Sequence, residues 1–494
     1  KLAKKGIDIK IIYGMEGYLY DDEGCINDDG SIDIKKKSTN HIIFLVKNQT
    51  GLTNLYKMVS TSHIDYFYKK PRLPRSVIEK YREGIIIGSA CEAGEVYRAV
   101  MQGKSDEELI RIASYYDYLE IQPRGNNQFL VDKGIVKSEK DILDFNKKVL
   151  EIGDRLGKMT VATTDAHYPN KESAIFRNII MAGMGFSETN SNNLYLKTTD
   201  EMIEEFSYLG DRAHEVVVTN TNKIADMIEK IRPIPPDKCY PEISGSKEML
   251  SKSCYDRAHE LYGDPLPDVV EERLSKELDS IIGNGYAALY IAAQMLIKKS
   301  EEDGYIVGSR GSVGSSFAAT MAGITEINPL APHYYCPKCK HFKLQDKLDK
   351  YDVGFDMPNK TCPKCGTLMK KDGFNIPFAT FLGFKGDKEP DIDLNFAGEY
   401  QPIAHRYVGK IFGEKNIFKA GTVSKIQEKT AYGFVKKFID ERQIEATDTD
   451  IEYLAKGCSG VKRTTGQHPG GIIVLPEGHE IYEFTPIQKP ANKR

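Results

Sequence analysis

The stretch Pro390-Asp391-Ile392-Asp393-Leu394-Asn395-Phe396 places two acidic residues one position apart inside a run that favours a β-strand. On a strand, residues i and i+2 share a face, so Asp391 and Asp393 should point one way and the apolar residues between them the other. Neighbouring carboxylates repel each other unless a cation joins them, and oxygen ligands of this kind suit Mg²⁺. The stretch predicts a magnesium-binding strand, and the alternative is a strand with a solvated acidic face.

A second motif, GSRGSVGSS over residues 308–316, lies between a predicted strand at 305–307 and a predicted helix from Phe317. In a glycine-rich turn, backbone N–H groups can approach an anion closely, and the following helix start adds a partial positive charge. Arg310 is the main side-chain cation available to phosphate. The phosphate-binding residues that we expect are Gly308, Ser309, Arg310, Gly311, Ser312, Gly314 and Ser315. A flexible loop is the alternative, and the motif is neither a P-loop nor a dinucleotide-binding fingerprint.

Four of the nine cysteines form two identical Cys-Pro-Lys-Cys pairs, separated by residues 340–361. Two such pairs predict a closed, tetrahedral, structural zinc site. Its four ligands would be Cys336, Cys339, Cys362 and Cys365. This cysteine usage favours a reducing cytoplasm over a disulfide framework. The lysines around the pairs either touch a phosphate backbone or only keep the module soluble, and both interpretations remain open.

Length and charge set broad limits. A chain of 494 residues suggests two to four domains. With 68 Lys and Arg against 71 Asp and Glu, it is not a general polycation. No apolar run approaches the ~20 residues of a membrane span, and no signal peptide is evident, so we expect no membrane association and a cytoplasmic location.

Residues 1–230 alternate short apolar runs with amphipathic helical patterns, which predicts a parallel sheet or barrel with its chemistry at the carboxyl ends of the strands. The strands are expected at 9–12, 42–46, 85–87, 118–121 and 160–163. Residue types that bind metals cluster near these ends: Glu16, His41, Cys91, Asp165 and His167, with His63 as an alternative to His41. Each also has a structural interpretation, for example Cys91 as a small buried apolar residue.

Downstream, a proline-rich stretch at 233–236 reads as a boundary. Helices are expected at 268–282, 286–299 and 399–412, and a strand at 416–418. A helical run opening at Gly421 carries Lys425, Lys429, Lys436 and Lys437, which suit a DNA backbone or a solvated face. A turn at 462–471 then leads into a strand at 472–475.

Three strings together resemble one family. GSRGSVGSSFAATMAGITEINPLAPHYYCPKCK (308–340), PDIDLNFAGEYQ (390–401) and TTGQHPGGIIVLP (464–476) are similar to the PolC-type DNA polymerase III alpha subunit of low-GC Gram-positive bacteria. The resemblance covers nearly the whole chain. It implies a palm like that of the polymerase-beta nucleotidyltransferases, in which Asp391 and Asp393 hold Mg²⁺, and Arg463 and His468 lie near the incoming nucleotide or primer end. The implied partners are primer-template DNA, deoxynucleoside triphosphate and, in the full-length parent, the sliding clamp and clamp loader.

The first part resembles the PHP (polymerase and histidinol phosphatase) domain, a distorted β/α barrel. This implies that Glu16, His41, Cys91, Asp165 and His167 ligate Zn²⁺ or Mn²⁺. The His-x-His pair that opens PHP domains is missing here, because the chain resembles only the part that follows an inserted exonuclease. The ligand set is therefore expected to be incomplete.

The resemblance implies a multidomain chain of α/β and α+β parts. Its divisions are a PHP domain at 1–230, a first palm segment at 231–330, a zinc-binding insertion at 331–375, a palm segment with the acid pair at 376–423, a helical thumb at 424–460 and a palm return at 461–494. The third palm acid and the fingers of the family are not matched, since Glu477, Glu480 and Glu483 stand in other contexts. We expect this chain alone not to extend a primer.

Two other functions remain open. One is a metal-dependent phosphoesterase whose working part is residues 1–230. The other is a non-catalytic, zinc-bearing nucleic-acid-binding protein.

Overall fold

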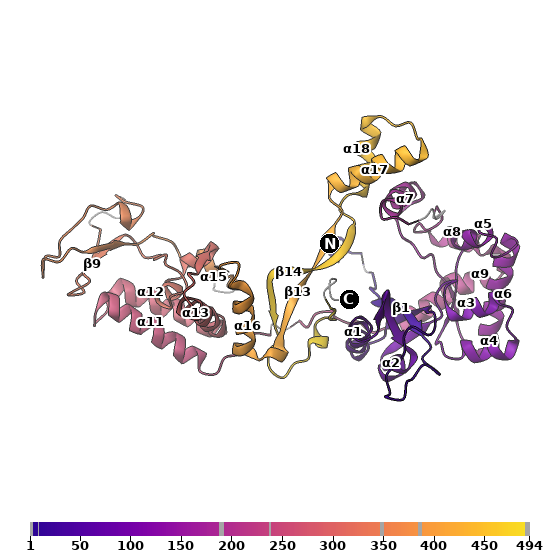
Figure 1. Cartoon of the computed structure of the whole chain (residues 1–494), viewed down its shortest axis with the longest axis horizontal. Coiled ribbons are helices and arrows are strands. Elements are labelled where there is room, and N and C mark those ends of the chain that lie inside the picture. Colours follow the sequence, from indigo (N-terminus) through magenta and orange to yellow (C-terminus); the bar gives the residue numbers. More distant parts are fainter. Residues whose placement is uncertain are drawn as a thin grey trace. The chain divides into compact units, whose positions relative to one another are not determined.

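The computed structural model describes residues 3–7, 9–186, 192–236, 239–345, 350–383 and 388–489. The chain divides into two compact units, each with its own apolar core (Figure 1). The first unit comprises Lys1–Pro236, Gly421–His468 and Glu480–Arg494, and the second comprises Asp237–Ala420 and Pro469–His479. The fold is thus a mixed α/β arrangement in more than one domain.

The first unit is built on a five-stranded sheet in the order β3-β4-β1-β2-β5. The strands are β1 (Gly14–Tyr20), β2 (Asn40–Val46), β3 (Phe67–Tyr68), β4 (Lys70–Pro74) and β5 (Ile85–Gly88). β1 and β4 are parallel, whereas β2 is antiparallel to both of its neighbours. The prediction of a parallel sheet is wrong here, because the connection between β1 and β2, at 21–39, is a loop without a helix and returns the chain antiparallel to β1.

The first predicted strand is also misplaced. Ile9 and Ile11 stay more than half exposed, whereas Leu19 and Tyr20 at the end of β1 are fully buried. The other four predicted strands lie within two residues of β2, β5, β6 (Leu119–Ile121) and β7 (Thr160–Ala162). β6 and β7 are parallel, with α6 (Glu139–Leu156) between them in sequence.

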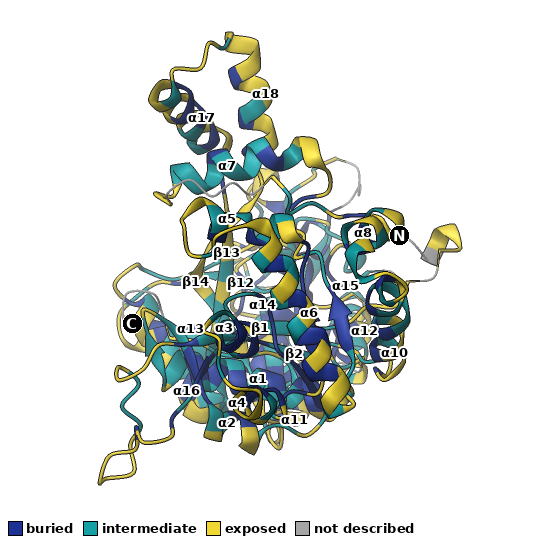
Figure 2. Ribbon diagram, turned by 90° about the vertical axis from the view of Figure 1, so that its right-hand side faces the viewer, coloured by how far each residue is buried: buried dark blue, intermediate teal, exposed yellow. Residues whose placement is uncertain are grey.

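Helices supply most of the core residues of this unit, and Figure 2 shows the burial of each residue along them. They are α1 (Gln49–Ile64), α2 (Arg75–Lys80), α3 (Glu95–Met101), α4 (Asp106–Ala113), α5 (Gln128–Asp132), α6, α7 (Ala174–Gly183), α8 (Thr199–Glu205), α9 (Arg212–His214) and α10 (Asn220–Asp226).

Two later helices, α17 (Glu428–Arg442) and α18 (Asp448–Cys458), pack on α7 through a separate apolar cluster that includes Ile179, Val435 and Ile451. Before them, β13 (Ile417–Lys425) replaces the first part of the predicted helical run. β13 pairs with β14 (Lys462–Val474), which is one long strand where a turn was predicted. The pairing of the two strands extends both beyond the short segments that local composition indicated.

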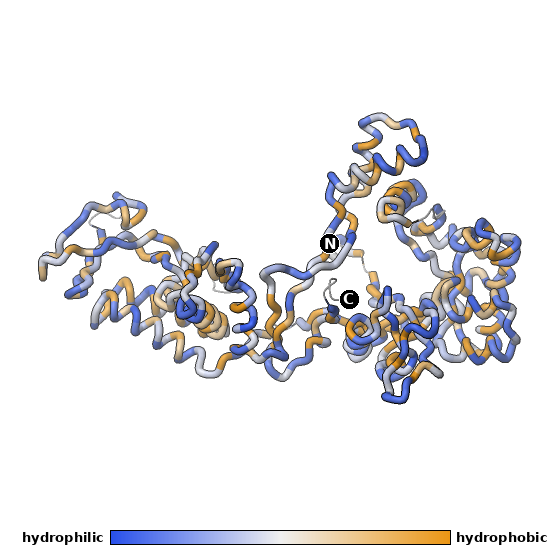
Figure 3. The backbone as a smooth tube through the Cα atoms, in the orientation of Figure 1, coloured by the Kyte–Doolittle hydropathy of each residue, from blue (hydrophilic) through white to orange (hydrophobic). Residues whose placement is uncertain are grey.

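The second unit is mainly helical around its core. Its helices are α11 (Ser246–Tyr262), α12 (Asp268–Gly283), α13 (Ala287–Glu302), α14 (Phe317–Met321), α15 (Ala379–Leu382) and α16 (Gln401–Phe412). Along α11, Leu250, Cys254 and Ala258 recur every fourth residue and are fully buried, which is the spacing of one helix face. Figure 3 shows hydrophobic and hydrophilic residues interspersed along these helices.

Five short strands complete this unit, apart from its shares of β13 and β14. β8 (Gly308–Arg310) pairs with β12 (Asp393–Asn395), and β9 (His333–Tyr335) lies between β10 (Phe342–Leu344) and β11 (Lys370–Asp372). Within the described residues, no single helix has the length and apolarity to cross a membrane. The pair α12 and α13, bent by 108°, meets that criterion only jointly and only by length and composition.

Candidate functional site

The acid pair and the glycine-rich loop lie side by side. β12 and β8 are antiparallel, with Asp393 opposite Arg310, Leu394 opposite Ser309 and Asn395 opposite Gly308. Arg310 Nη2 lies 3.4 Å from Asp393 Oδ2. Two motifs separated by about eighty residues of sequence thus meet in one two-stranded ladder. The strand expected at 305–307 is found three residues later, inside the loop motif itself.

The predicted alternation of side chains along the acid stretch is present. Ile392 and Leu394 pack against the apolar core of the second unit. Asp391, just before β12, is exposed, and Asp393 is partly exposed. Behind the strand, the Phe396 ring stacks on Tyr400, whose hydroxyl donates to Asp303 at 2.7 Å. The carboxylates therefore face solvent from a strand that is packed on its other side.

Only part of the glycine-rich loop reaches solvent. Gly311 is exposed and has φ +80°, a conformation that few other residues adopt. Ser312 is partly exposed, whereas Ser315 and Ser316 are buried. The Ser309 hydroxyl donates to Thr325 Oγ1 at 2.8 Å. An anion on this loop would meet its first half, next to Asp393.

The ion pair between Arg310 and Asp393 is weak because both side chains are exposed to water. The Arg310 side chain is 68% exposed and that of Asp393 is 45% exposed. An ion pair in water contributes at most about 1 kcal/mol, since both groups remain well solvated. Arg310 can therefore exchange the carboxylate for a phosphate at little cost.

The four cysteines predicted as zinc ligands converge. All their Sγ atoms lie within 4.8 Å of one another, and two pairs, Cys336 with Cys365 and Cys339 with Cys362, are 3.4 Å apart. Zn–S bonds of about 2.3 Å in a tetrahedron require sulfur separations of about 3.8 Å, so the donor set fits zinc. The Thr367 hydroxyl and amide lower the pKa of Cys365 to about 6, which favours the thiolate that a metal needs.

The two cysteine pairs share one backbone geometry. Lys340 and Gly366, the residues directly after each pair, both have positive φ, at 62° and 71°. Their N–H groups donate to the carbonyl oxygens of Cys336 and Cys362 at 3.0 and 2.9 Å. Each pair thus forms the same tight turn with both thiols on its inner side.

Three of the residues predicted as ligands in the first unit also converge: Glu16, His41 and Cys91, here called the Glu16 cluster. His41 Nδ1 lies 3.1 Å from Glu16 Oε1 and 3.4 Å from Cys91 Sγ. Glu16 lies inside β1 and not after a strand, while Cys91 follows β5 as predicted. The loop after β5 folds back on β2, because His41 N–H donates to Ala93 at 3.0 Å.

The Glu16 cluster has the donor types of a zinc or manganese site: a carboxylate, an imidazole and a thiol. Burial raises the pKa of the Cys91 thiol well above its usual range, and the neighbouring Glu92 adds to this effect. Metal binding would have to displace that proton. The mutual distances fit one ion, and three protein ligands leave a coordination position open.

Asp165 and His167 form a pair in the loop after β7, with His167 Nε2 at 3.5 Å from Asp165 Oδ1. His167 lowers the pKa of Asp165, and His41 of the Glu16 cluster acts in the same direction. Asp165 has φ 47°, an uncommon conformation for a residue other than glycine. His63, the alternative to His41, instead lies in the last turn of α1, with Nδ1 3.0 Å from the Val59 carbonyl oxygen.

The sequence interpretation missed Glu120, an acid inside β6. It is buried, and burial raises its pKa to about 7. The hydrogen bonds from Thr163 and Gln122 act in the opposite direction and lower this pKa. Asp165 and Glu16 raise that pKa further, so Glu120 lies in the electrostatic field of both metal-binding groups. The signal was available, because an acid between Leu119 and Ile121 interrupts an otherwise apolar strand.

The two remaining predicted residues lie on β14, in the first unit. The Arg463 guanidinium lies 5.9 Å from the centre of the Phe434 ring, and His468 is exposed. Their role at a nucleotide stays a prediction.

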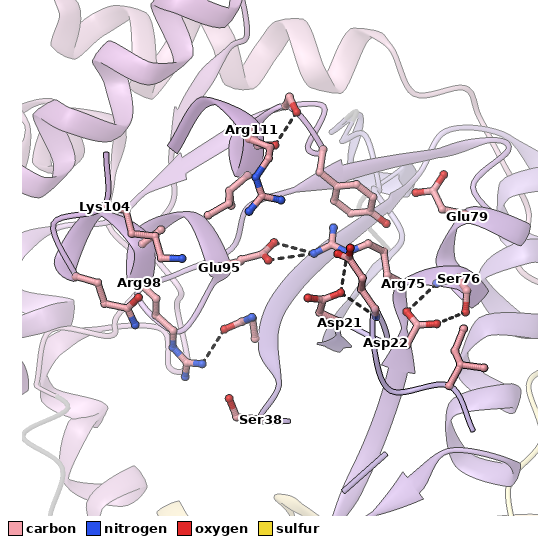
Figure 4. A pocket seen from close by; sticks show the side chains of 18 residues that line it. Asp21, Asp22, Ser38, Arg75, Ser76, Glu79, Glu95, Arg98, Lys104 and Arg111 are labelled. Carbon is pink, nitrogen blue, oxygen red and sulfur yellow. Dashed lines mark hydrogen bonds and ion pairs between the residues drawn. The ribbon is translucent and has the colours of Figure 1, made fainter. Parts of the chain in front are cut away.

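A cavity of about 780 Å³ in the first unit is lined by charged side chains that pair with one another (Figure 4). Arg75 Nη2 lies 3.0 Å from both carboxylate oxygens of Glu95, and the Ser76 hydroxyl donates to Asp22 at 2.5 Å. Arg98 donates to Asn40 Oδ1 at 2.8 Å. These contacts hold α2 and α3 to the end of the sheet.

Comparison with known proteins finds matches to two families along the chain. Residues 248–448 and 435–494 match the family described as the bacterial DNA polymerase III alpha NTPase domain, and residues 1–124 match the PHP domain. The chain belongs to the bacterial DNA polymerase III alpha family.

Its relatives in that family include PolC-type enzymes. The DNA polymerase III PolC-type of Clostridium perfringens is 56% identical over 465 residues, which cover 94% of this chain and 32% of that protein. That of Bacillus subtilis is 50% identical over 482 residues, covering 97% of this chain and 33% of that protein. The chain spans about a third of the length of the curated relatives that it matches.

Proposed function

We propose that β12 and the glycine-rich loop form the nucleotidyl-transfer site of a template-directed, replicative DNA polymerase. The observation that carries this proposal is the β8–β12 ladder, which sets Asp393 opposite Arg310. A chain in which the acids and the loop lay apart could not bring a metal ion and a triphosphate together. Membership of the polymerase III alpha family and the PolC-type relatives support the same assignment.

In this proposal each group has one task. Asp391 and Asp393 hold the divalent cations, and Arg310 turns from Asp393 to the triphosphate. The backbone N–H groups of the exposed half of the loop bind phosphate oxygens. When bound, Mg²⁺ lowers the pKa of the primer 3′-hydroxyl and offsets charge on the leaving pyrophosphate. The protein contributes chiefly position and preorganised charge.

The DNA contacts belong to basic residues of α17, in the thumb, and of β14. Lys429, Lys436 and Lys437 are exposed on α17, while its apolar face packs on α7. Lys462 and Arg463 are exposed on β14. We assign these residues to the phosphate backbone of primer-template DNA, which would make binding weaker at high salt. The cysteine module binds structural zinc, and the sliding clamp and clamp loader are partners of the full-length protein.

The test is the dependence of metal and nucleotide binding on Asp391. We expect Asp391→Asn to weaken Mn²⁺ binding, followed by electron paramagnetic resonance with dATP present, by at least tenfold. Asp279→Asn, at an exposed position on α12, is the matched control and should change it less than twofold. At the matching position of a full-length relative, the same substitution should reduce primer extension at least a hundredfold. If Asp391→Asn bound Mn²⁺ as tightly as the wild-type chain, the proposal would be wrong, and a non-catalytic, zinc-bearing nucleic-acid-binding protein would be the better assignment.

The Glu16 cluster favours a second function, metal-dependent phosphoester hydrolysis by the first unit. Glu16, His41 and Cys91 supply three ligands, and Asp165 with His167 lies within electrostatic reach of them. Hydrolysis of a phosphodiester probe with Mn²⁺ should then survive Asp391→Asn and be lost in Asp165→Asn. No hydrolysis by the wild-type chain would leave the cluster a structural role only.

A further inference from the structure

A buried acid stands at the start of α14, directly behind the glycine-rich loop. Glu277 on α12 is fully buried, and its Oε2 accepts hydrogen bonds from the Ser316 hydroxyl and the Ala318 N–H, both at 3.0 Å. The Ser316 oxygen in turn accepts from the Ala319 N–H at 3.1 Å. The N–H groups that open α14 are therefore bound to side chains of the protein itself.

Arg273, one turn earlier on α12, completes the arrangement. Its Nε is paired with Glu277, and its Nη2 donates to the carbonyl oxygens of Ser315 at 2.9 Å and Ile376 at 3.0 Å. Ser315 lies in the second half of the glycine-rich loop, and Ile376 precedes α15, between that loop and the acid strand in sequence. One guanidinium thus ties together the two segments that carry the site.

An ion pair whose carboxylate is fully buried is costly to desolvate and contributes little to stability by itself. Here it satisfies the Ser315 and Ile376 carbonyls, the start of α14 and the Ser316 hydroxyl. It also places a carboxylate where a bound phosphate would otherwise meet the helix start, and like charges repel.

We propose that Glu277 and Arg273 are positioning residues for the triphosphate. They fix the second half of the glycine-rich loop and exclude the phosphates from the start of α14. The phosphates are then held by Gly308–Ser312, beside Asp393. The inference rests on the proposed nucleotidyl-transfer function and names the residues that keep the nucleotide on the exposed half of the loop.

Calorimetric titration of the chain with Mg·dATP tests the inference, because it shows whether each substitution weakens or tightens nucleotide binding. Glu277→Gln and Arg273→Lys should each weaken binding about tenfold, because the loop loses its anchor. Glu272→Gln, at an exposed position on the same helix, should change it less than twofold. Tighter binding in Glu277→Gln would show that the start of α14 is the phosphate site and would overturn the inference, as would unchanged binding in both variants.

Hydrogen exchange separates this inference from the proposed function. In the absence of nucleotide, Glu277→Gln should speed amide exchange in residues 311–319 at least tenfold while leaving α11 unchanged. If the wild-type chain binds no Mg·dATP, the proposed function fails and the exchange result alone decides whether the pair anchors the loop. Unchanged exchange would refute the anchor, and exchange raised throughout α11 would reduce the pair to general support of the core.

Discussion

The four-cysteine cluster and the Glu16 cluster reach similar compactness by different routes. The cysteines come from two short turns of identical sequence, and each turn supplies two ligands by its own geometry. The Glu16 cluster draws one residue each from β1, β2 and the loop after β5. The four-cysteine cluster is thus encoded by local sequence. The Glu16 cluster forms only when β1, β2 and β5 pair in the correct register.

The two sites also differ in what a metal would do for the fold. The cysteine module has a small apolar cluster, in which two ligands, Cys336 and Cys362, are themselves core residues. The Glu16 cluster lies on a sheet already held by the main core of the first unit. A metal should therefore organise the first site and only occupy the second.

The largest effect is expected at the cysteine cluster. Cys362→Ser should abolish stoichiometric zinc and unfold the module, since structural zinc binding contributes on the order of 10 kcal/mol in small zinc-dependent folds. Zinc content and hydrogen exchange in residues 331–375 report it. Cys239→Ser, outside the cluster, should keep both at the wild-type level. Retained zinc in Cys362→Ser would mean that the site is not closed by four thiolates.

A smaller effect on metal binding is expected at the Glu16 cluster, where His41 contacts both Glu16 and Cys91. His41→Ala removes the group that contacts both other members, and we expect Mn²⁺ affinity in the first unit to fall about a hundredfold, or about 3 kcal/mol. The cysteine site is kept saturated with zinc during the titration. His63→Ala is the matched control, because His63 is bound to a helix carbonyl. Equal losses in the two variants would place the ion elsewhere.

The sequence predicted what is local and missed what depends on pairing. Two cysteine pairs and the alternating acid stretch carry their geometry in their spacing, so their convergence or exposure followed from the residues alone. Helices α12, α13 and α16 were placed within three residues at each end for the same reason. The family resemblance supplied the link between the acid strand and the loop, which no spacing rule relates.

The misses share a physical cause. β14 is continuous through glycines and a proline because β13 pairs with it, and an isolated reading of those residues favours a turn. The antiparallel pairing of β1 and β2 depends on a connection without a helix. Glu120 and Glu277 were overlooked because acids are rarely buried, and only the fold shows which donors compensate them.

Glu120 offers the finest test of how far the Glu16 cluster depends on its surroundings. Its carboxyl has a folded pKa of about 7 against an ordinary value of 4.5. The folded state thus binds more protons than the unfolded state between these values. Stability attributable to this group is full below pH 4.5 and is lost as the pH rises through 7. Glu120→Gln carries no such loss.

The advantage of Glu120→Gln over the wild-type chain should therefore grow by about 2 kcal/mol between pH 5 and pH 8 in metal-free urea unfolding. Glu204→Gln, at an exposed position on α8, should show no growth. Part of the effect comes from Asp165 and Glu16, which raise the pKa of Glu120 by their charge. A cation bound between these acids would offset that charge, so added Mn²⁺ should shrink the difference. A pH dependence that Mn²⁺ leaves unaltered would show that burial alone sets the pKa and that no ion binds within reach of Glu120.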